Sequence, residues 1–205
     1  MSVIRYPMIW IVTALALVCQ APAANAKVTV SERTTYYSVR GDSGGQLGKA
    51  LLTGGYGAIN VAQAIAATAS RLSLPVFRTE VKNGRCVVTN VTVALNITYR
   101  FPKWSDRGRA SNRVRGAWEV FYRELVRHEH QHGAISRQHA DRLERELKRL
   151  SDTGSFGCQS LKRMATVSFD KWSKKLKKAQ VLFDRLEDSD MSKITRLQLA
   201  LFKAK

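Results

Sequence analysis

The feature that most constrains the fold is a change of hydrophobic period at Pro102. Before it, apolar side chains occupy alternate positions through residues 87–101, which predicts an antiparallel strand with one buried face. After it, from about Asn112 to Leu150, apolar residues recur every three or four positions. This second spacing predicts a long amphipathic helix. Strands followed by helices indicate an α+β fold.

Shorter signals complete the predicted architecture. Asn83-Gly84 comes just before the alternating segment and predicts a tight hairpin turn, with a partner strand near residues 74–81. Residues 27–41 are rich in Val, Thr and Tyr and predict one or two further strands. Helical spacing returns near residues 161–186 and 191–202. We therefore expect an N-terminal antiparallel sheet with a hairpin, then the long helix, then C-terminal helices.

The N-terminus has the order of a secretory signal. Arg5 precedes an apolar run from Met8 to Val18, and Ala24-Asn25-Ala26 then supplies the small-x-small pattern of a cleavage site. We expect residues 1–26 to be a signal peptide and residues 27–205 to form a single domain. The mature protein is then exported to the periplasm or secreted.

Removal of this segment leaves two cysteines, Cys86 and Cys158. An isolated pair in an oxidising compartment is most simply a disulfide, and two separate buried thiols are the alternative. Such a bond closes a long loop, which the chain-entropy description values at roughly 4 kcal/mol.

The charge balance is strongly basic, with 34 Lys and Arg against 16 Asp and Glu and a formal net charge of +18. Such a charge allows nucleic acid, anionic lipid or acidic polysaccharide as partners. Export argues against a natural nucleic-acid partner and favours an anionic envelope surface. Two basic stretches, 100–116 and 169–180, could meet an anionic substrate or membrane, or could be solvated faces.

All four histidines fall within "RHEHQHGAISRQH", residues 127–139. Positions four apart share one face of a helix, so His128 and His132 can together bind a zinc ion. Glu129 is turned by about 100° from His128, close enough to take a proton from a water on the metal. This arrangement predicts a zinc-dependent enzyme that hydrolyses peptide or protein substrates. The alternative is a helix whose histidines are partly exposed and satisfied by neighbours.

The third ligand remains open at this stage. His139 lies about 10 Å along a straight helix from His132, too far to share a metal. An unbroken helix of this length would measure nearly 60 Å, beyond the size expected of such a domain, and Gly133 is a plausible break that would bring His139 back. The other candidate ligands are Asp141, Glu144 and Asp184.

Several landmarks together resemble one known family. They are "TTYYSVRG" from Thr34, the hairpin with Cys86, "FPKW" at 101–104, and W118-x3-Y122-x2-L125-x2-H128-E129-x2-H132. In this order they resemble a bacterial family of uncharacterised domains described as predicted secreted zinc-dependent proteases. The likeness extends from about Thr34 to Asp184. It implies that His128 and His132 are metal ligands and that Glu129 is the catalytic carboxylate.

Two functional hypotheses follow. The first is an exported zinc metallopeptidase with His128 and His132 holding the ion and Glu129 as general base. The second is a non-catalytic, cationic envelope-binding protein whose metal site is structural or adventitious. The first predicts hydrolysis that depends on Glu129, and the second predicts salt-sensitive binding that survives loss of the histidines.

Overall fold

The computed structural model describes residues 25–54, 64–152, 157–188 and 193–205, and strand β3 is the centre of its sheet. β3 spans Arg85–Trp104 and lies between β1, Asn25–Val39, and β2, Ala67–Lys82. The expected signal peptide, residues 1–26, lies outside the described residues except for its last two positions, which begin β1.

The predicted hairpin is confirmed. β2 and β3 pair in the antiparallel direction and are joined at Asn83 and Gly84, whose φ angles are +51° and +74°. A two-residue turn with both φ angles positive matches the twist of the strands that it connects. Glycine adopts this conformation without steric cost, and asparagine tolerates it better than most residues. β2 begins seven residues earlier than the expected position 74.

The sheet is mixed, which corrects the expectation of a purely antiparallel one. β1 pairs with β3 in the parallel direction, from Asn25 opposite Asn90 to Val39 opposite Trp104. The reason is the strand order: β3 folds back from β2 and inserts between the two earlier strands, so it runs in the direction of β1. Alternation along one strand carries no information about which strand lies next to it.

The alternation of β3 is interrupted by a β-bulge at Thr89. Arg78 pairs with Asn90 and Thr79 pairs with Val88, so Thr89 has no opposite residue. One extra residue shifts the two-residue period by one position. The predicted inward face therefore holds from Val91 to Phe101, whereas before the bulge Cys86 and Val88 are buried in place of the expected Val87.

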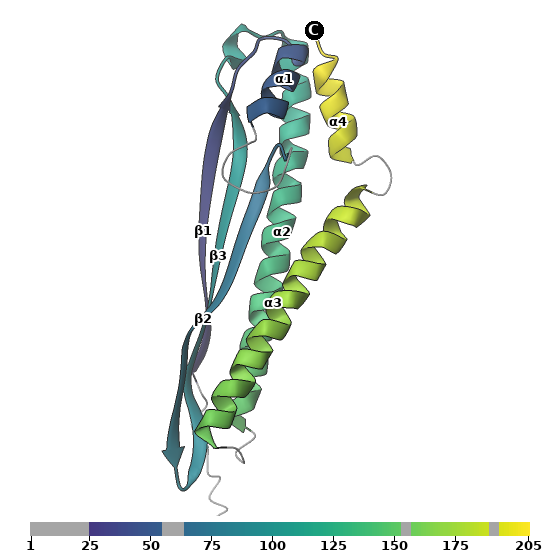
Figure 1. The fold of residues 1–205 in the computed structure, drawn as a ribbon. Coiled ribbons are helices and arrows are strands. Elements are labelled where there is room, and N and C mark those ends of the chain that lie inside the picture. The colour runs from purple at the N-terminus through teal and green to yellow at the C-terminus, as the bar shows by residue number, and fades with distance from the viewer. Residues whose placement is uncertain (1–24, 55–63, 153–156, 189–192) are drawn as a thin grey trace, which may run out of the picture.

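Helix α2, Asn112–Asp152, runs unbroken along the sheet (Figure 1). Ser111 caps its start by accepting the Val114 N–H at 3.3 Å. The expected break at Gly133 is wrong, because Gly133 lies inside the helix directly beneath Tyr99 of β3. At about 1.5 Å per residue the helix is some 60 Å long, and the fold accommodates this length by being elongated.

The core forms where the buried face of β3 meets the inward face of α2. The strand contributes alternate apolar residues, and the helix contributes apolar residues at three- and four-residue spacing. These buried side chains are Val91, Val93, Leu95, Ile97, Tyr99 and Phe101 from β3, and Val114, Trp118, Phe121, Leu125, Leu143 and Leu147 from α2. The helix is thereby fixed along most of the sheet.

Helix α3, Cys158–Asp188, crosses α2 and contacts β2 (Figure 1). The α2–α3 interface contains Glu146, which accepts hydrogen bonds from Ser168, Lys171 and Trp172 at 2.8–3.0 Å. Burial raises the pKa of the Glu146 carboxyl, but these three donors outweigh it and hold the pKa below 4.5. Glu146 is therefore a charged anchor between the two helices.

The remaining helices lie near the start of α2 (Figure 1). α1 spans Gly44–Gly54 and α4 spans Lys193–Phe202. They meet closely, with the Gly44 N–H donating to the carbonyl of Ala204 at 3.1 Å. The α+β class is confirmed. Within the described ranges no helix combines the length and the apolar character needed to cross a membrane.

A disulfide joins Cys86 to Cys158, with Cα atoms 5.1 Å apart, as the cysteine count led us to expect. It links the start of β3 to the first residue of α3. The bulge at Thr89 matters here, because it gives Cys86 the buried side of the strand.

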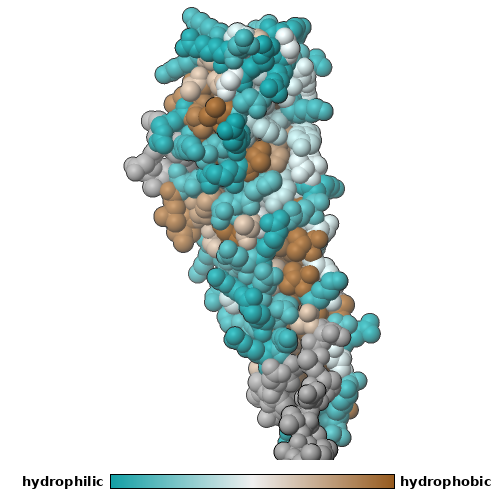
Figure 2. All heavy atoms as spheres, turned by 180° about the vertical axis from the view of Figure 1, so that it is seen from behind, coloured by the Kyte–Doolittle hydropathy of each residue, from teal (hydrophilic) through white to brown (hydrophobic). Residues whose placement is uncertain are grey.

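The surface seen from behind is largely hydrophilic, and its hydrophobic residues form separate patches (Figure 2).

Candidate metal centre

Three side chains from two helices converge in one group. His128 and His132 come from α2 and Asp184 comes from α3, and one potential ligand atom from each lies within 4.8 Å of the other two. Asp184 Oδ1 is 2.9 Å from His132 Nε2 and 3.5 Å from His128 Nε2. The two Nε2 atoms are 3.2 Å apart. Of the four candidate third ligands, the structure brings Asp184 to the histidines.

The two imidazoles are positioned by helix geometry and by packing. His128 and His132 are four residues apart on α2, so they project from the same face. The ring of Phe183 lies against both, at 4.9 Å from each imidazole centroid. Because Phe183 directly precedes Asp184, the same turn of α3 supplies both the packing surface and the carboxylate.

His139 is not part of this group, which corrects its candidacy as third ligand. Its Nδ1 donates to the Ile135 carbonyl at 2.8 Å, and its ring lies 5.9 Å from Trp172. The unbroken α2 keeps it almost two turns beyond His132, as a straight helix requires. Asp141 and Glu144 lie further along the same helix and are also outside the group.

Gln180 orients His132. Its Oε1 lies 2.5 Å from His132 Nδ1, and its Nε2 donates to the His132 carbonyl at 3.1 Å and to Ser136 Oγ at 2.9 Å. The amide oxygen requires a proton on Nδ1, so Nε2 is the nitrogen with a free lone pair directed at the group. This is how the outer partner of a metal-binding histidine fixes its tautomer and ring orientation.

His128 Nδ1 is buried and has no hydrogen-bond partner in the described chain. Glu187 Oε2 is 3.6 Å from this nitrogen and also meets Arg127. Gln180, Asp184 and Glu187 follow one another at four- and three-residue spacing, so they share one face of α3. Sequence reasoning missed Gln180 and Glu187, although this polar spacing on a predicted amphipathic helix was the available signal.

Glu129 is buried beside the histidines, with 5% of its surface exposed. Thr68 Oγ1 from β2 donates to Glu129 Oε2 at 2.7 Å. Burial raises the pKa of the Glu129 carboxyl above its ordinary value, while the Thr68 hydrogen bond and the two imidazoles act in the opposite direction. The second oxygen, Oε1, accepts no hydrogen bond from the described residues.

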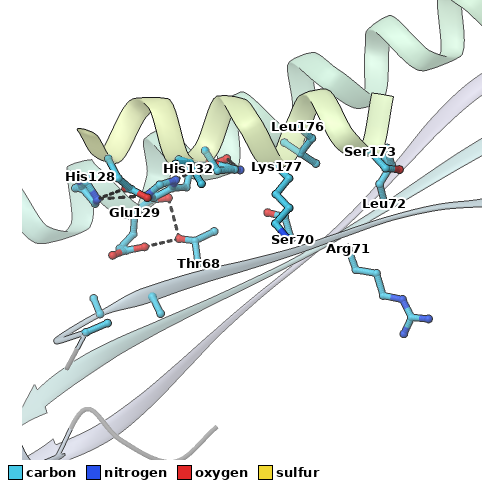
Figure 3. Close-up of a pocket in the computed structure, with 16 residues that line it drawn as sticks. Thr68, Ser70, Arg71, Leu72, His128, Glu129, His132, Ser173, Leu176 and Lys177 are labelled. Carbon is cyan, nitrogen blue, oxygen red and sulfur yellow. Dashed lines mark hydrogen bonds and ion pairs between the residues drawn. The ribbon is translucent and has the colours of Figure 1, made fainter. Parts of the chain in front are cut away.

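These residues form one end of a pocket of about 670 Å³ between β2 and α3 (Figure 3). From β2 the wall includes Thr68, Ser70 and Leu72, and from α3 it includes Ser173, Leu176, Lys177 and Gln180. A volume of this size accommodates several residues of a peptide or a comparable small molecule.

The donor set suits a catalytic zinc site. Two imidazole nitrogens and one carboxylate oxygen are three protein ligands, which leave a fourth position for water or substrate. Glu129 lies beside the group without belonging to it, and the pocket gives access from solvent. The arrangement can therefore bind a divalent ion and place a carboxylate next to a water on it.

Comparison with known proteins identifies the family. The chain has no match among curated proteins or among solved structures. A family model described as a bacterial protein of unknown function (DUF922) matches residues 34–190, which include the histidines, Glu129 and Asp184. Since this match covers most of the chain, the protein belongs to the DUF922 family.

Proposed function

We propose that the protein is an exported zinc-dependent metallopeptidase. His128, His132 and Asp184 hold the ion, and Glu129 is the general base. The observation that carries the proposal is the arrival of Asp184 from a separate helix at the two histidines of α2, within 4.8 Å. A chance pairing of two histidines and a glutamate on one helix gives no reason for a third ligand to converge there, at the end of a pocket.

The chemistry proposed is hydrolysis of an amide bond. When bound by His128, His132 and Asp184, zinc would supply a Lewis acid that polarises the carbonyl and lowers the pKa of water. Glu129 accepts a proton from the attacking water and passes it to the nitrogen of the leaving amine as the C–N bond breaks. Thr68 holds Glu129 Oε2, which leaves Oε1 for the proton, and Gln180 keeps Nε2 of His132 available.

The first test is the metal content of untagged mature protein. We expect one zinc ion per chain, lost in a His128→Ala/His132→Ala variant and strongly reduced in Asp184→Asn. His130→Ala is the matched control, because His130 lies on the same helix but packs on Tyr99 with its ring 4.7 Å away. No metal in the wild type after zinc addition and dialysis, or equal metal in the double variant, contradicts the proposal.

The second test is hydrolysis of a peptide library by zinc-loaded protein. Glu129→Gln is expected to keep its zinc and to lose activity by about 10²–10⁴-fold, the usual contribution of a general base. Full hydrolytic activity in Glu129→Gln would overturn the assignment.

Export is tested separately by sequencing the N-terminus of the protein from the periplasm or medium, which is expected to begin at Lys27.

A second candidate is binding to an anionic envelope surface, which the outer side of α3 favours. Lys174, Lys178 and Leu182 recur every four residues and are exposed, and Leu182 leaves 56% of its surface in solvent. This candidate predicts binding to anionic vesicles that weakens with salt and persists in a protein without its four histidines. Binding that is insensitive to salt counts against it.

A further inference from the structure

We infer that the pocket selects peptides that carry a carboxylate about three residues from the bond that is cut, and that Lys177 recognises this carboxylate. The inference rests on the proposed peptidase function. Lys177 lies on α3, lines the pocket and extends toward β2 (Figure 3). Its ammonium makes no ion pair or hydrogen bond with the residues that the structure describes. It is therefore available to an occupant of the pocket.

The other charges around the pocket leave this role to Lys177. The acidic lining residues are Glu129 and Asp184, to which the proposed function assigns the roles of general base and metal ligand. Arg71 also borders the pocket, but its side chain points away from α3 (Figure 3). Leu72 and Leu176 also line the pocket and are uncharged. Away from the metal centre, the pocket therefore contains a positive group, Lys177, whose charge no described acidic residue neutralises.

The spacing along α3 sets the register. Lys177 precedes Asp184 by seven residues, which corresponds to about 10 Å along the helix. An extended peptide advances about 3.3 Å per residue, so a carboxylate near Lys177 belongs to a residue about three positions from the scissile bond. The pocket runs between β2 and α3, and an extended occupant lies along both. Either an acidic side chain or the C-terminal carboxylate of a short peptide supplies the same chemistry.

The activity test uses a short neutral peptide in which a single Glu is moved along the sequence, with matched Gln peptides. Both ends are blocked, and a further peptide has a free C-terminus in place of Glu. Mass spectrometry of the products locates the cut bond. Zinc-loaded wild type is expected to cut about three residues from Glu and to favour Glu over Gln by about tenfold, the effect of one charge-assisted hydrogen bond. If the peptide with a free C-terminus is cut as well as the peptide with Glu, the recognised carboxylate can be that of a chain end, and the enzyme trims chain ends.

Variants assign the preference. Lys177→Met keeps the aliphatic stem and removes the charge, so it is expected to lose the preference for Glu, and Lys177→Glu is expected to reverse it. Lys178→Met is the matched control, since Lys178 is exposed on the same helix and does not line the pocket. Unchanged preference in Lys177→Met, or equal loss in Lys178→Met, overturns the inference.

A binding test separates this inference from the proposed function. Zinc-loaded Glu129→Gln is titrated with the same peptides, and binding is followed by fluorescence anisotropy. We expect the same preference for Glu, weaker at high salt, and its loss on adding Lys177→Met. Selective binding without hydrolysis by the wild type would overturn the peptidase and keep the carboxylate preference. Hydrolysis without a preference for Glu would keep the peptidase and overturn the carboxylate preference. An absence of both hydrolysis and selective binding would count against both proposals.

Discussion

Substitution of Gly133 tests whether α2 is continuous and pressed against the sheet beside its histidines. A Cβ atom at Gly133 would lie 2.0 Å from the hydroxyl oxygen of Tyr99 and 3.0 Å from its Cζ. Tyr99 is 3% exposed and belongs to the central strand, so its ring has little room to move. Gly116 lies in the same helix with no atom within 4 Å of the corresponding position, and it provides the matched control.

Replacing Gly133 by alanine has two opposing effects on the unfolding free energy. Replacing glycine by alanine in a helix interior contributes about 1 kcal/mol of stability. At Gly133 the added methyl is about 1.5 Å too close to the hydroxyl, because non-bonded carbon contacts need about 3.5 Å. Overpacking costs about 1–3 kcal/mol, and we use the upper end since the neighbour is buried. Gly133→Ala is thus expected to lose about 2 kcal/mol, and Gly116→Ala to gain about 1 kcal/mol.

Urea unfolding followed by circular dichroism measures both effects. With a slope near 2 kcal/mol/M, the midpoint is expected to fall by roughly 1 M for Gly133→Ala and to rise by roughly 0.5 M for Gly116→Ala. Tyr99→Phe removes the atom in closest contact, so adding it to Gly133→Ala is expected to restore part of the loss in a double-mutant cycle. A Gly133→Ala midpoint at or above that of the wild type refutes the close packing of α2 on β3.

Three further predictions concern the metal site and α3. Gln180→Ala frees Nδ1 of His132 and is expected to weaken zinc binding by about 10–100-fold in a competitive chelator titration, with the fold unchanged. Reduction of the Cys86–Cys158 bond, which spans 72 residues, is expected to lower the unfolding free energy by roughly 4 kcal/mol, measured in urea with and without reductant. Glu146→Gln is expected to cost about 1–2 kcal/mol at pH 7. Because the folded pKa of Glu146 is lowered, its contribution is present above pH 4.5 and is lost as the pH falls through that lowered value, so urea midpoints of wild type and variant should converge in acid.

The elements of the fold were largely predictable because each is determined by local pattern. The period change at Pro102, the Asn83-Gly84 turn and the helical spacing after Asn112 all correspond to observed features. The parallel pairing of β1 was not predictable, since strand order depends on long-range contacts. The shift of phase at Thr89 was also hidden, because a bulge changes no residue type. The expectation of a helix break came from assuming a rounder domain than this one.

Part of the candidate site was also predictable, because that part is determined by local sequence pattern. Two candidate ligands, His128 and His132, and the neighbouring Glu129 lie within about one turn of α2, and their spacing alone places them on one side of the helix. Asp184 lies 52 residues beyond His132, and it was one of four candidates, with His139, Asp141 and Glu144, until the crossing of α3 over α2 was known. The roles of Gln180 and Thr68 depend on the same crossing and on the position of β2. Ligands that neighbouring elements contribute need the tertiary structure.

Because Asp184 lies near the end of α3, this helix is attached to the rest of the molecule at both of its ends. The disulfide at Cys158 attaches the first residue of this helix to the sheet, and the contacts of Asp184 with the histidines attach its far end to α2. About 39 Å of helix separates the two attachments. Reduction releases one end and loss of the Asp184 contacts releases the other, so either change alone leaves α3 tethered. An ion bound by His128, His132 and Asp184 would therefore strengthen the attachment of α3 to α2 at one end, while the disulfide holds the other end to the sheet.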